Sequence, residues 1–252
     1  MDAQSQAFAS SGPETCRTMI DRADLRCILS NLSQELCRPL ESLRVGFDLL
    51  LVESPEGFKC EQRGHVQTMA ELCDEMLSLT RSYLDYAGLV HGTRPLNFGT
   101  FTISAMIREV DREFAEVASK AKIGWECVVL GPDATVTTDA SHCQQILGNL
   151  ASNALKYTGE GGNVRVVGLF EGDHWLIKVS DNGPGIPAEY LGHVFEPFFR
   201  LPRDGRSTAQ GSGLGLAICR EMVQQLGGSI KLTYADSGGI EATVRFPVAM
   251  IE

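Results

Sequence analysis

Residues 179–187 read VSDNGPGIP, and this stretch decides how the second half of the chain is interpreted. It follows a short β-like run, Trp175–Val179, so Asp181 is expected at the end of a strand. Gly183 and Gly185 allow backbone to come close to a flat ligand. A carboxylate in this position can accept a hydrogen bond from an exocyclic amine such as that of adenine. The same letters also suit an ordinary turn, so the interpretation depends on other stretches.

The stretch upstream, QQILGNLASNALKYT at residues 144–158, has the spacing of a helix. Its apolar residues form a core face, and Asn149 and Asn153, four apart, share a neighbouring face. An Asn amide oxygen is a neutral ligand suited to Mg²⁺ that is held mainly by phosphates and water. Lys156 adds a positive charge nearby. An ordinary helix with exposed polar residues explains this stretch equally well when it is taken alone.

Two stretches follow downstream, HVFEPFFR at 193–200 and GSGLGLAIC at 211–219. The first is expected to pack four apolar side chains together and ends in Arg200. The second is a glycine-rich turn that opens a helix, whose free N–H groups and dipole favour phosphate. It follows no βαβ strand and lacks the Lys-Ser/Thr of a P-loop, so dinucleotide-binding and Walker-type sites fit poorly. The polar segment between them, LPRDGRSTAQ, is expected to be a mobile lid.

The chain divides into two halves with different hydrophobic periods. From Thr15 to Tyr86 apolar residues recur every three or four positions, which predicts two long helices joined at a turn near Pro55 and Gly57. A hairpin cannot bury such a seam alone, so self-association into a four-helix bundle is expected. A helical subdomain docked within one chain is the alternative. After a polar joint, the pattern predicts hairpins at 164–170/175–179 and 229–234/240–246, a strand at 125–130, and helices at 103–121, 141–157 and 214–226.

Together the four stretches resemble the motifs of sensor histidine kinases of two-component systems. They match the N box (Asn149–Thr158), G1 box (Asp181–Pro187), F box (Phe195–Arg200) and G2 box (Gly211–Ala217) of that family. The resemblance implies an α+β chain, with a helical hairpin followed by a two-layer sandwich of the histidine-kinase/Hsp90/gyrase ATPase type. It divides the chain into a flexible leader (1–14), a dimerisation and phosphotransfer-like hairpin (15–90), a linker (91–98) and a catalytic ATP-binding domain (99–252).

The resemblance also implies a set of binding residues for ATP and Mg²⁺. It assigns Asn153 to Mg²⁺, Asp181 to adenine, Lys156 to the phosphates and the loop from Gly211 to Gly215 to closure over the triphosphate. The ATP-binding set further includes Asn149, Tyr157, Gly183, Gly185, Arg200, Gly213 and Leu214. None of these positions departs from the family pattern.

The hairpin departs from the pattern at the position that matters for phosphoryl transfer. The family signature Ser-His-Glu-Leu-Arg-Thr-Pro-Leu corresponds here to residues 33–40, SQELCRPL, so Gln34 stands where the phosphoacceptor histidine is expected. A neutral imidazole has a free nitrogen lone pair, whereas that of an amide is delocalised into its carbonyl. Glu35 keeps the acid that polarises the histidine, while Cys37 and Arg38 replace the usual Arg and Thr. Self-phosphorylation at the usual position is therefore doubtful.

Three functions are open at this point. The first is an ATP-binding histidine-kinase homologue that dimerises and signals by conformation, or that phosphorylates another histidine kinase. The second is an active kinase whose Gln34 is engineered or bypassed by another residue. The third is an ATP-driven clamp or anti-sigma-type kinase, against which the F box and the long hairpin argue. The other histidines (65, 91, 142, 174 and 193) lack an acid-Pro context and are expected at the surface.

Composition limits the partners. The net charge is −10 and no Lys/Arg-rich run occurs, so a nucleic-acid surface is not expected. No apolar stretch approaches the roughly 18 residues of a membrane span, and the first residues lack a signal-peptide pattern. The eight cysteines form no CxxC pair, which favours reduced, buried thiols in a cytoplasmic protein. The expected partners are a second copy of the chain and a response-regulator receiver domain or another histidine kinase.

Overall fold

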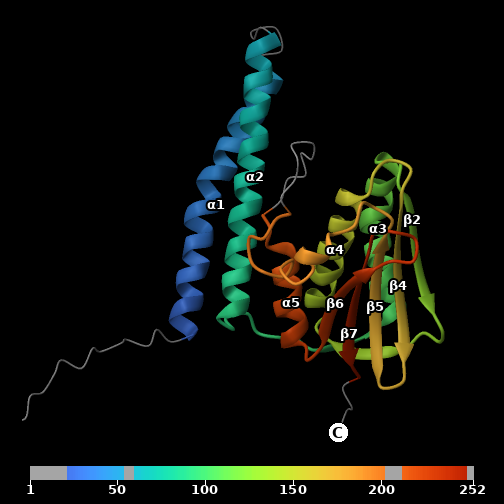
Figure 1. The fold of residues 1–252 in the computed structure, drawn as a ribbon. Helices are drawn as coiled ribbons and strands as arrows, with labels where there is room; N and C mark the ends of the chain where they lie inside the picture. Colours follow the sequence, from blue (N-terminus) through green and yellow to red (C-terminus); the bar gives the residue numbers. More distant parts are fainter. Residues whose placement is uncertain (1–21, 54–59, 202–211, 249–252) are drawn as a thin grey trace, which may run out of the picture.

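A computed structural model describes residues 22–53, 60–201 and 212–248 of the chain. Two long helices, α1 (Arg22–Glu53) and α2 (Cys60–Val90), lie side by side next to a mixed α/β unit (Figure 1). Ion pairs between Arg44 and Asp74 (2.7 Å) and between Arg81 and Glu41 (2.6 Å) show that the two helices run antiparallel. Within the described residues, no helix is both long and apolar enough to cross a membrane.

Among the side chains that the structure describes, few are buried inside the helical hairpin. The buried side chains between its helices are Cys37, Ala70, Cys73 and Leu77, and Pro39 lies inside the otherwise continuous α1. Much of the predicted apolar seam is exposed in the single chain, including Leu36, Leu43 and Leu50 of α1. The predicted helical hairpin is present, and it leaves a large apolar surface uncovered.

The α/β unit is built on a five-stranded sheet in the order β2-β4-β5-β7-β6. Its strands are β2 (Gly124–Leu130), β4 (Asn163–Glu171), β5 (His174–Asp181), β6 (Ser229–Tyr234) and β7 (Ile240–Pro247). β4 with β5 and β6 with β7 form the two predicted antiparallel hairpins. β2 pairs parallel with β4, because the chain between them crosses over through a helix instead of a tight turn.

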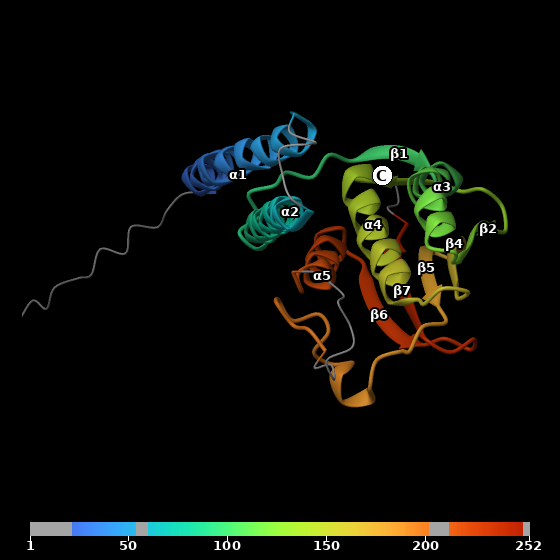
Figure 2. The same ribbon diagram turned by 90° about the horizontal axis from the view of Figure 1, so that it is seen from above.

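Three helices cover one face of this sheet (Figure 2). They are α3 (Ile103–Lys120), α4 (Ala140–Tyr157) and α5 (Gly215–Gln225). The helix α3 contacts β2 and β4, α4 contacts β4 and β5, and α5 contacts β6. The Thr102 and Asp139 side chains cap α3 and α4 by accepting hydrogen bonds from backbone N–H groups. The core between the layers includes the stacked rings of Trp175 and Phe246, whose centroids lie 4.4 Å apart. The two-layer α+β sandwich expected from the sequence is confirmed.

Two short strands were not expected. β1 (Gly99–Thr102) and β3 (Thr135–Thr138) pair antiparallel as a separate two-stranded sheet, and a single 3-10 turn (Ala188–Tyr190) follows the motif at 179–187. Both strands are only four residues long and rich in threonine, so their hydrophobic alternation is too short to predict a strand.

The expectation that all five histidines lie at the surface is wrong for His142, which is 1% exposed. His142 precedes Ile146 by one turn and therefore shares the face of α4 that packs into the core. The side chains of His65, His91 and His193 are exposed, and His174 is partly exposed. Sequence context alone does not show whether a polar residue of a helix points toward the core or toward solvent.

The described cysteines behave as the sequence predicts. Cys37, Cys73, Cys143 and Cys219 are buried, Cys127 is half-buried, and all five are free thiols. Burial raises the pKa of Cys219 to about 12 and that of Cys143 to about 11, so both thiols stay protonated near neutral pH. Cys16 and the side chains of Cys27 and Cys60 lie outside the described part of the chain.

Candidate functional site

A pocket of about 410 Å³ opens where α4, the start of α5 and the ends of β5 and β7 meet α2. Residues from all four sequence motifs line it. From the predicted set these are Asn149, Asn153, Lys156, Tyr157, Asp181, Gly185, Arg200, Gly213 and Gly215. Gly183 and Leu214 are not among the lining residues, and Gly211 and most of the expected lid fall outside the described residues. Within this set, the fold therefore brings together residues that are up to 66 positions apart, such as Asn149 and Gly215.

Asp181 ends β5 at the floor of the pocket. Its Oδ1 accepts hydrogen bonds from the backbone N–H groups of Gly183 (2.9 Å) and Ile240 (3.4 Å). Burial raises the pKa of Asp181, and these two N–H groups act in the opposite direction by stabilising the ionised carboxylate. Because Oδ1 is occupied by backbone donors, Oδ2 is the oxygen left to face a ligand. The geometry suits a carboxylate that accepts a hydrogen bond from a buried amine.

Two glycines allow this placement of Asp181, and the sequence indicated only one of them. A Cβ on Gly183 would lie 2.8 Å from the Tyr157 carbonyl oxygen. A Cβ on Gly239, in the turn before β7, would lie 2.3 Å from the Asp181 carbonyl oxygen and 2.4 Å from its Oδ1. Gly239 was missed because its partner is 58 positions away in the chain, although the Gly238-Gly239 pair marked a turn.

We expect Gly239→Ala to distort the Asp181 corner and Gly238→Ala to leave it intact. Both glycines have positive φ (+84° for Gly238 and +74° for Gly239), so both substitutions carry a backbone cost of about 1–2 kcal/mol. Only the methyl group at position 239 meets Asp181, whereas the space around position 238 is open within 4 Å.

Chemical denaturation and nucleotide titration of both variants test this pair. Gly239→Ala is expected to lose more stability and to bind nucleotide at least about tenfold more weakly than Gly238→Ala, because a shifted carboxylate loses its hydrogen bond. Equal nucleotide affinity in the two variants would contradict the role given to Gly239.

The apolar wall of the pocket was also not predicted from the sequence. It includes Val179, Ile186, Leu232, Ile240 and Ala242, which come from β5, β6, β7 and the loop after β5. The alternating burial along β7 places Ile240 and Ala242 on the same face as the core residue Val244. A flat apolar ligand can pack against this wall while its polar edge meets Asp181.

Asn149 and Asn153 project from α4 toward the start of α5. The Asn149 Nδ2 donates a hydrogen bond to the Gly215 carbonyl oxygen (3.4 Å), and a Cβ on Gly215 would lie 3.8 Å from Asn153 Nδ2. Among the described residues, no side chain caps α5, so none of them accepts hydrogen bonds from the N–H groups of its first turn in this way. This arrangement of amides and a helix N-terminus suits phosphate groups.

The cationic side chains at this end of the pocket are Lys156 and Arg200. The Lys156 Nζ lies 5.3 Å from the ring centroid of Tyr157, which is partly exposed. The described residues include no group of three or more His, Cys, Asp or Glu side chains that could hold a metal. A divalent cation here would therefore depend on Asn153 and on the ligand's own oxygens.

The segment 193–200 packs less tightly than expected. Val194 is buried, but Phe198 is 56% exposed, so the prediction of four tightly packed apolar side chains is wrong for this residue. The Phe198 N–H donates to the Gly213 carbonyl oxygen (3.0 Å), and a Cβ on Gly213 would meet the Phe198 backbone at 2.8 Å. Phe198 stacks on Tyr83 of α2 with ring centroids 6.3 Å apart. Its ring is used to contact the hairpin and not the core.

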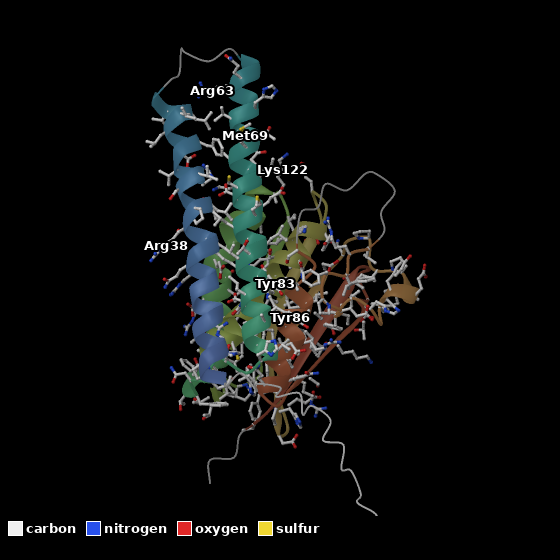
Figure 3. The ribbon with its side chains drawn as sticks, turned by 90° about the vertical axis from the view of Figure 1, so that its left-hand side faces the viewer. Arg38, Arg63, Met69, Tyr83, Tyr86 and Lys122 are labelled. Carbon is white, nitrogen blue, oxygen red and sulfur yellow. The ribbon has the colours of Figure 1, made fainter. Side chains whose placement is uncertain are left out.

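Two of the residues predicted on α1, Gln34 and Arg38, are not among the residues that line the pocket. Gln34 and Arg38 are exposed, and Figure 3 shows Arg38 pointing away from α2. The side chain of Glu35 lies outside the described part of the chain. α2 lies between α1 and the α/β unit and supplies Ser78, Ser82 and Asp85 to the pocket lining (Figure 1). These α2 residues were not predicted, because no local pattern distinguishes them from other polar positions of the helix.

The sequence and the fold that carry this pocket match those of known proteins. Residues 138–250 match the family described as histidine kinase-, DNA gyrase B- and HSP90-like ATPases. The autoinducer 2 sensor kinase/phosphatase LuxQ of Vibrio cholerae is 30% identical over 256 residues, which cover 99% of this chain and 28% of LuxQ. The chain spans about a quarter of the length of the curated relatives it matches.

Two solved structures agree with this match. ShkA in complex with AMPPNP has a TM-score of 0.73 and 28% identity, covering 89% of this chain and 46% of ShkA. The catalytic domain of the histidine kinase ThkA has a TM-score of 0.55 and 30% identity, covering 61% of this chain and 97% of that domain.

The fold and the match together define the class. The α/β unit is an ATPase domain of the histidine kinase, gyrase B and HSP90 type, a family that binds nucleotide. The chain belongs to the histidine kinase family of two-component signalling.

Proposed function

We propose that the chain is the ATP-binding core of a sensor histidine kinase that does not phosphorylate itself at the usual position of α1. The observation that carries this proposal is a pocket lined by residues of all four motifs, combined with Gln34 at the acceptor position. The core signals by its conformation or phosphorylates a histidine of a partner kinase. The division into a dimerisation hairpin (15–90), a linker (91–98) and a catalytic domain (99–252) is part of the proposal.

The nucleotide is ATP with Mg²⁺. The adenine lies against the apolar wall, with its amine donating to Asp181. The triphosphate extends toward the uncapped start of α5, where Lys156 and Arg200 supply positive charge. Asn153 is the protein ligand of Mg²⁺, and the remaining ligands are phosphate oxygens and water. The described side chains fit this group, because an amide lies beside a helix N-terminus and a carboxylate lies at the opposite end of the pocket.

The hairpin is the proposed dimer interface. The exposed apolar residues of α2 are Met69, Leu72, Met76, Leu79, Tyr83 and Val90. Their steps of three, four and seven place them on one stripe, and Leu36, Leu43 and Leu50 repeat at heptad spacing on α1. A surface of this size is unusual for a monomer, and a second hairpin in a four-helix bundle would cover it. The other expected partner is a response-regulator receiver domain or a second histidine kinase.

We expect Leu72→Glu to weaken dimerisation about 100-fold, because a symmetric interface would bury two unpaired carboxylates. Gln67→Glu is the matched control, since position 67 lies on another side of α2 and receives the same charge. Light scattering over a concentration series without nucleotide measures the change. A dimer that forms only with ATP would favour a nucleotide-driven clamp, and a monomer at all concentrations would contradict the interface.

The function itself is tested with γ-labelled ATP. The unmodified chain is expected to bind ATP and to acquire no acid-labile, base-stable label, which is the signature of a phosphorylated histidine. Such label on the unmodified chain would contradict the proposal.

A further inference from the structure

One face of α2 forms a wall of the nucleotide pocket. Ser78, Ser82 and Asp85 line the pocket, and their spacing of four and three residues places them on the same side of the helix. α2 lies next to α5, whereas α1 lies beyond α2 (Figures 1 and 2). The hydroxyl groups nearest to the pocket from the hairpin are therefore those of α2.

This wall lies at the end of the pocket that suits phosphate. The Asp85 Oδ2 accepts a hydrogen bond from the Gln145 Nε2 (3.3 Å), and Gln145 precedes Asn149 by one turn of α4. Asn149 in turn donates to the carbonyl oxygen of Gly215, the first residue of α5. Asp85 is thus connected to the side chains that frame the start of α5.

A second contact fixes the same part of α2. Tyr83 stacks on Phe198, and the Phe198 N–H donates to Gly213 at the entrance to α5. Asp181, in contrast, is held by Gly183 and by Ile240 of β7 at the adenine end. Ser82 and Asp85 therefore lie toward the region of the terminal phosphate when the adenine amine meets Asp181.

We propose that Ser82 accepts the γ-phosphoryl group of ATP, with Asp85 as the base. The proposal rests on the proposed ATP-binding function. The Ser82 Oγ forms a bond to the γ-phosphorus while the bond from that phosphorus to the β–γ bridging oxygen breaks. ADP leaves with the electron pair of the broken bond, and the hydroxyl proton goes to the Asp85 carboxylate. The product is a phosphoserine on α2, and Gln34 takes no part.

Ser82 fits this role better than the other serines of the pocket. Ser82 is half-buried and three residues from Asp85, whereas Ser78 is exposed and seven residues away. The Ser212 hydroxyl accepts a hydrogen bond from the Leu214 N–H. Ser152 of α4 is exposed and is followed one turn later by Lys156 and not by a carboxylate. Among the serines that line the described pocket, Ser82 alone combines partial burial with a carboxylate one turn away.

The test uses the full chain with γ-labelled ATP and Mg²⁺, and it measures acid-stable label and its position by mass spectrometry. We expect label on Ser82 that falls at least about tenfold in Ser82→Ala and in Asp85→Asn, because the nucleophile or its base is removed. Thr80→Ala, on the same helix but outside the pocket lining, is expected to keep the label. Asp181→Asn is expected to lose it, which excludes a contaminating kinase.

An ATP titration of each variant separates the two proposals. Label is compared among the variants at saturating ATP, so that a loss of label in Ser82→Ala reports phosphoryl transfer and not ATP affinity. A chain that binds ATP but acquires no label, or that carries its label on another residue, would overturn the assignment of Ser82 and leave the proposed ATP binding intact. A chain that does not bind ATP would overturn both proposals.

Discussion

Asp181→Asn is expected to weaken ATP binding by about 100-fold while leaving the fold intact. The asparagine keeps an oxygen at the Oδ1 position, where Gly183 and Ile240 donate their backbone N–H groups. It therefore places an NH₂ group at the Oδ2 position, so that a donor faces the adenine amine. The loss combines a charge-assisted hydrogen bond with two donors left unpaired in a buried site, each at a cost of about 1–3 kcal/mol.

The stability of Asp181→Asn without nucleotide distinguishes this effect from misfolding. Burial raises the pKa of Asp181, so its ionised form is less favourable in the folded chain than in the unfolded chain. This carboxylate therefore contributes most to stability when it is protonated, and its contribution falls as the pH rises through the raised pKa. At pH 7 we expect Asp181→Asn to unfold at the same temperature as the unmodified chain or at a higher one.

The same raised pKa predicts how ATP affinity responds to pH. Protonation of Asp181 removes the acceptor for the adenine amine, so affinity should begin to fall at a higher pH than an ordinary aspartate would give. Titrations by calorimetry across the acidic range measure this fall. For the Asp181→Asn variant, a strongly reduced melting temperature, or an ATP affinity equal to that of the unmodified chain, would contradict the role of Asp181.

Gln34→His is expected to produce acid-labile, base-stable label from γ-labelled ATP, increasing that label at least on the order of tenfold above background. The substitution supplies a ring nitrogen with a free lone pair next to Glu35, in a chain whose pocket motifs match the family pattern. Acid lability distinguishes this product from a phosphoserine on α2.

Two companion variants sharpen the Gln34→His experiment. Adding Cys37→Arg and Arg38→Thr restores the family signature around position 34 and is expected to raise the label further. Adding Asp181→Asn is expected to remove it. If neither the single nor the triple variant gains acid-labile label while both bind ATP, the α1 substitutions are not what prevents phosphorylation.

The fold was predictable where the signal is local. The spacing of apolar residues predicts α1 and α2, and the Gly/Asp turns predict the β4/β5 and β6/β7 hairpins. The threonine-rich β1 and β3 were not predictable, because four residues carry too little alternation. The burial of His142 was missed for a different reason. The neighbouring residues in the sequence do not indicate that the inward face of α4 accommodates a polar ring.

The motif residues of the nucleotide pocket were predictable from the sequence, but the residues around them that complete the pocket were not. Asn149, Asn153 and Asp181 belong to stretches with recognisable spacing, and the fold brings them to one pocket. Gly239 was missed because its importance depends on a backbone approach to Asp181 that only the sheet register creates. The α2 wall was missed because packing of the hairpin against α5 is a long-range contact with no local pattern.

Calorimetric titration of the unmodified chain with ATP in the presence of Mg²⁺ tests the central claim most directly, because every role proposed for the site depends on an intact nucleotide pocket. We expect saturable binding of one ATP per chain, competed by ADP and not by GTP, because guanine presents a carbonyl in place of the amine that meets Asp181. Absence of saturable binding at millimolar ATP, or equal competition by GTP, would contradict it.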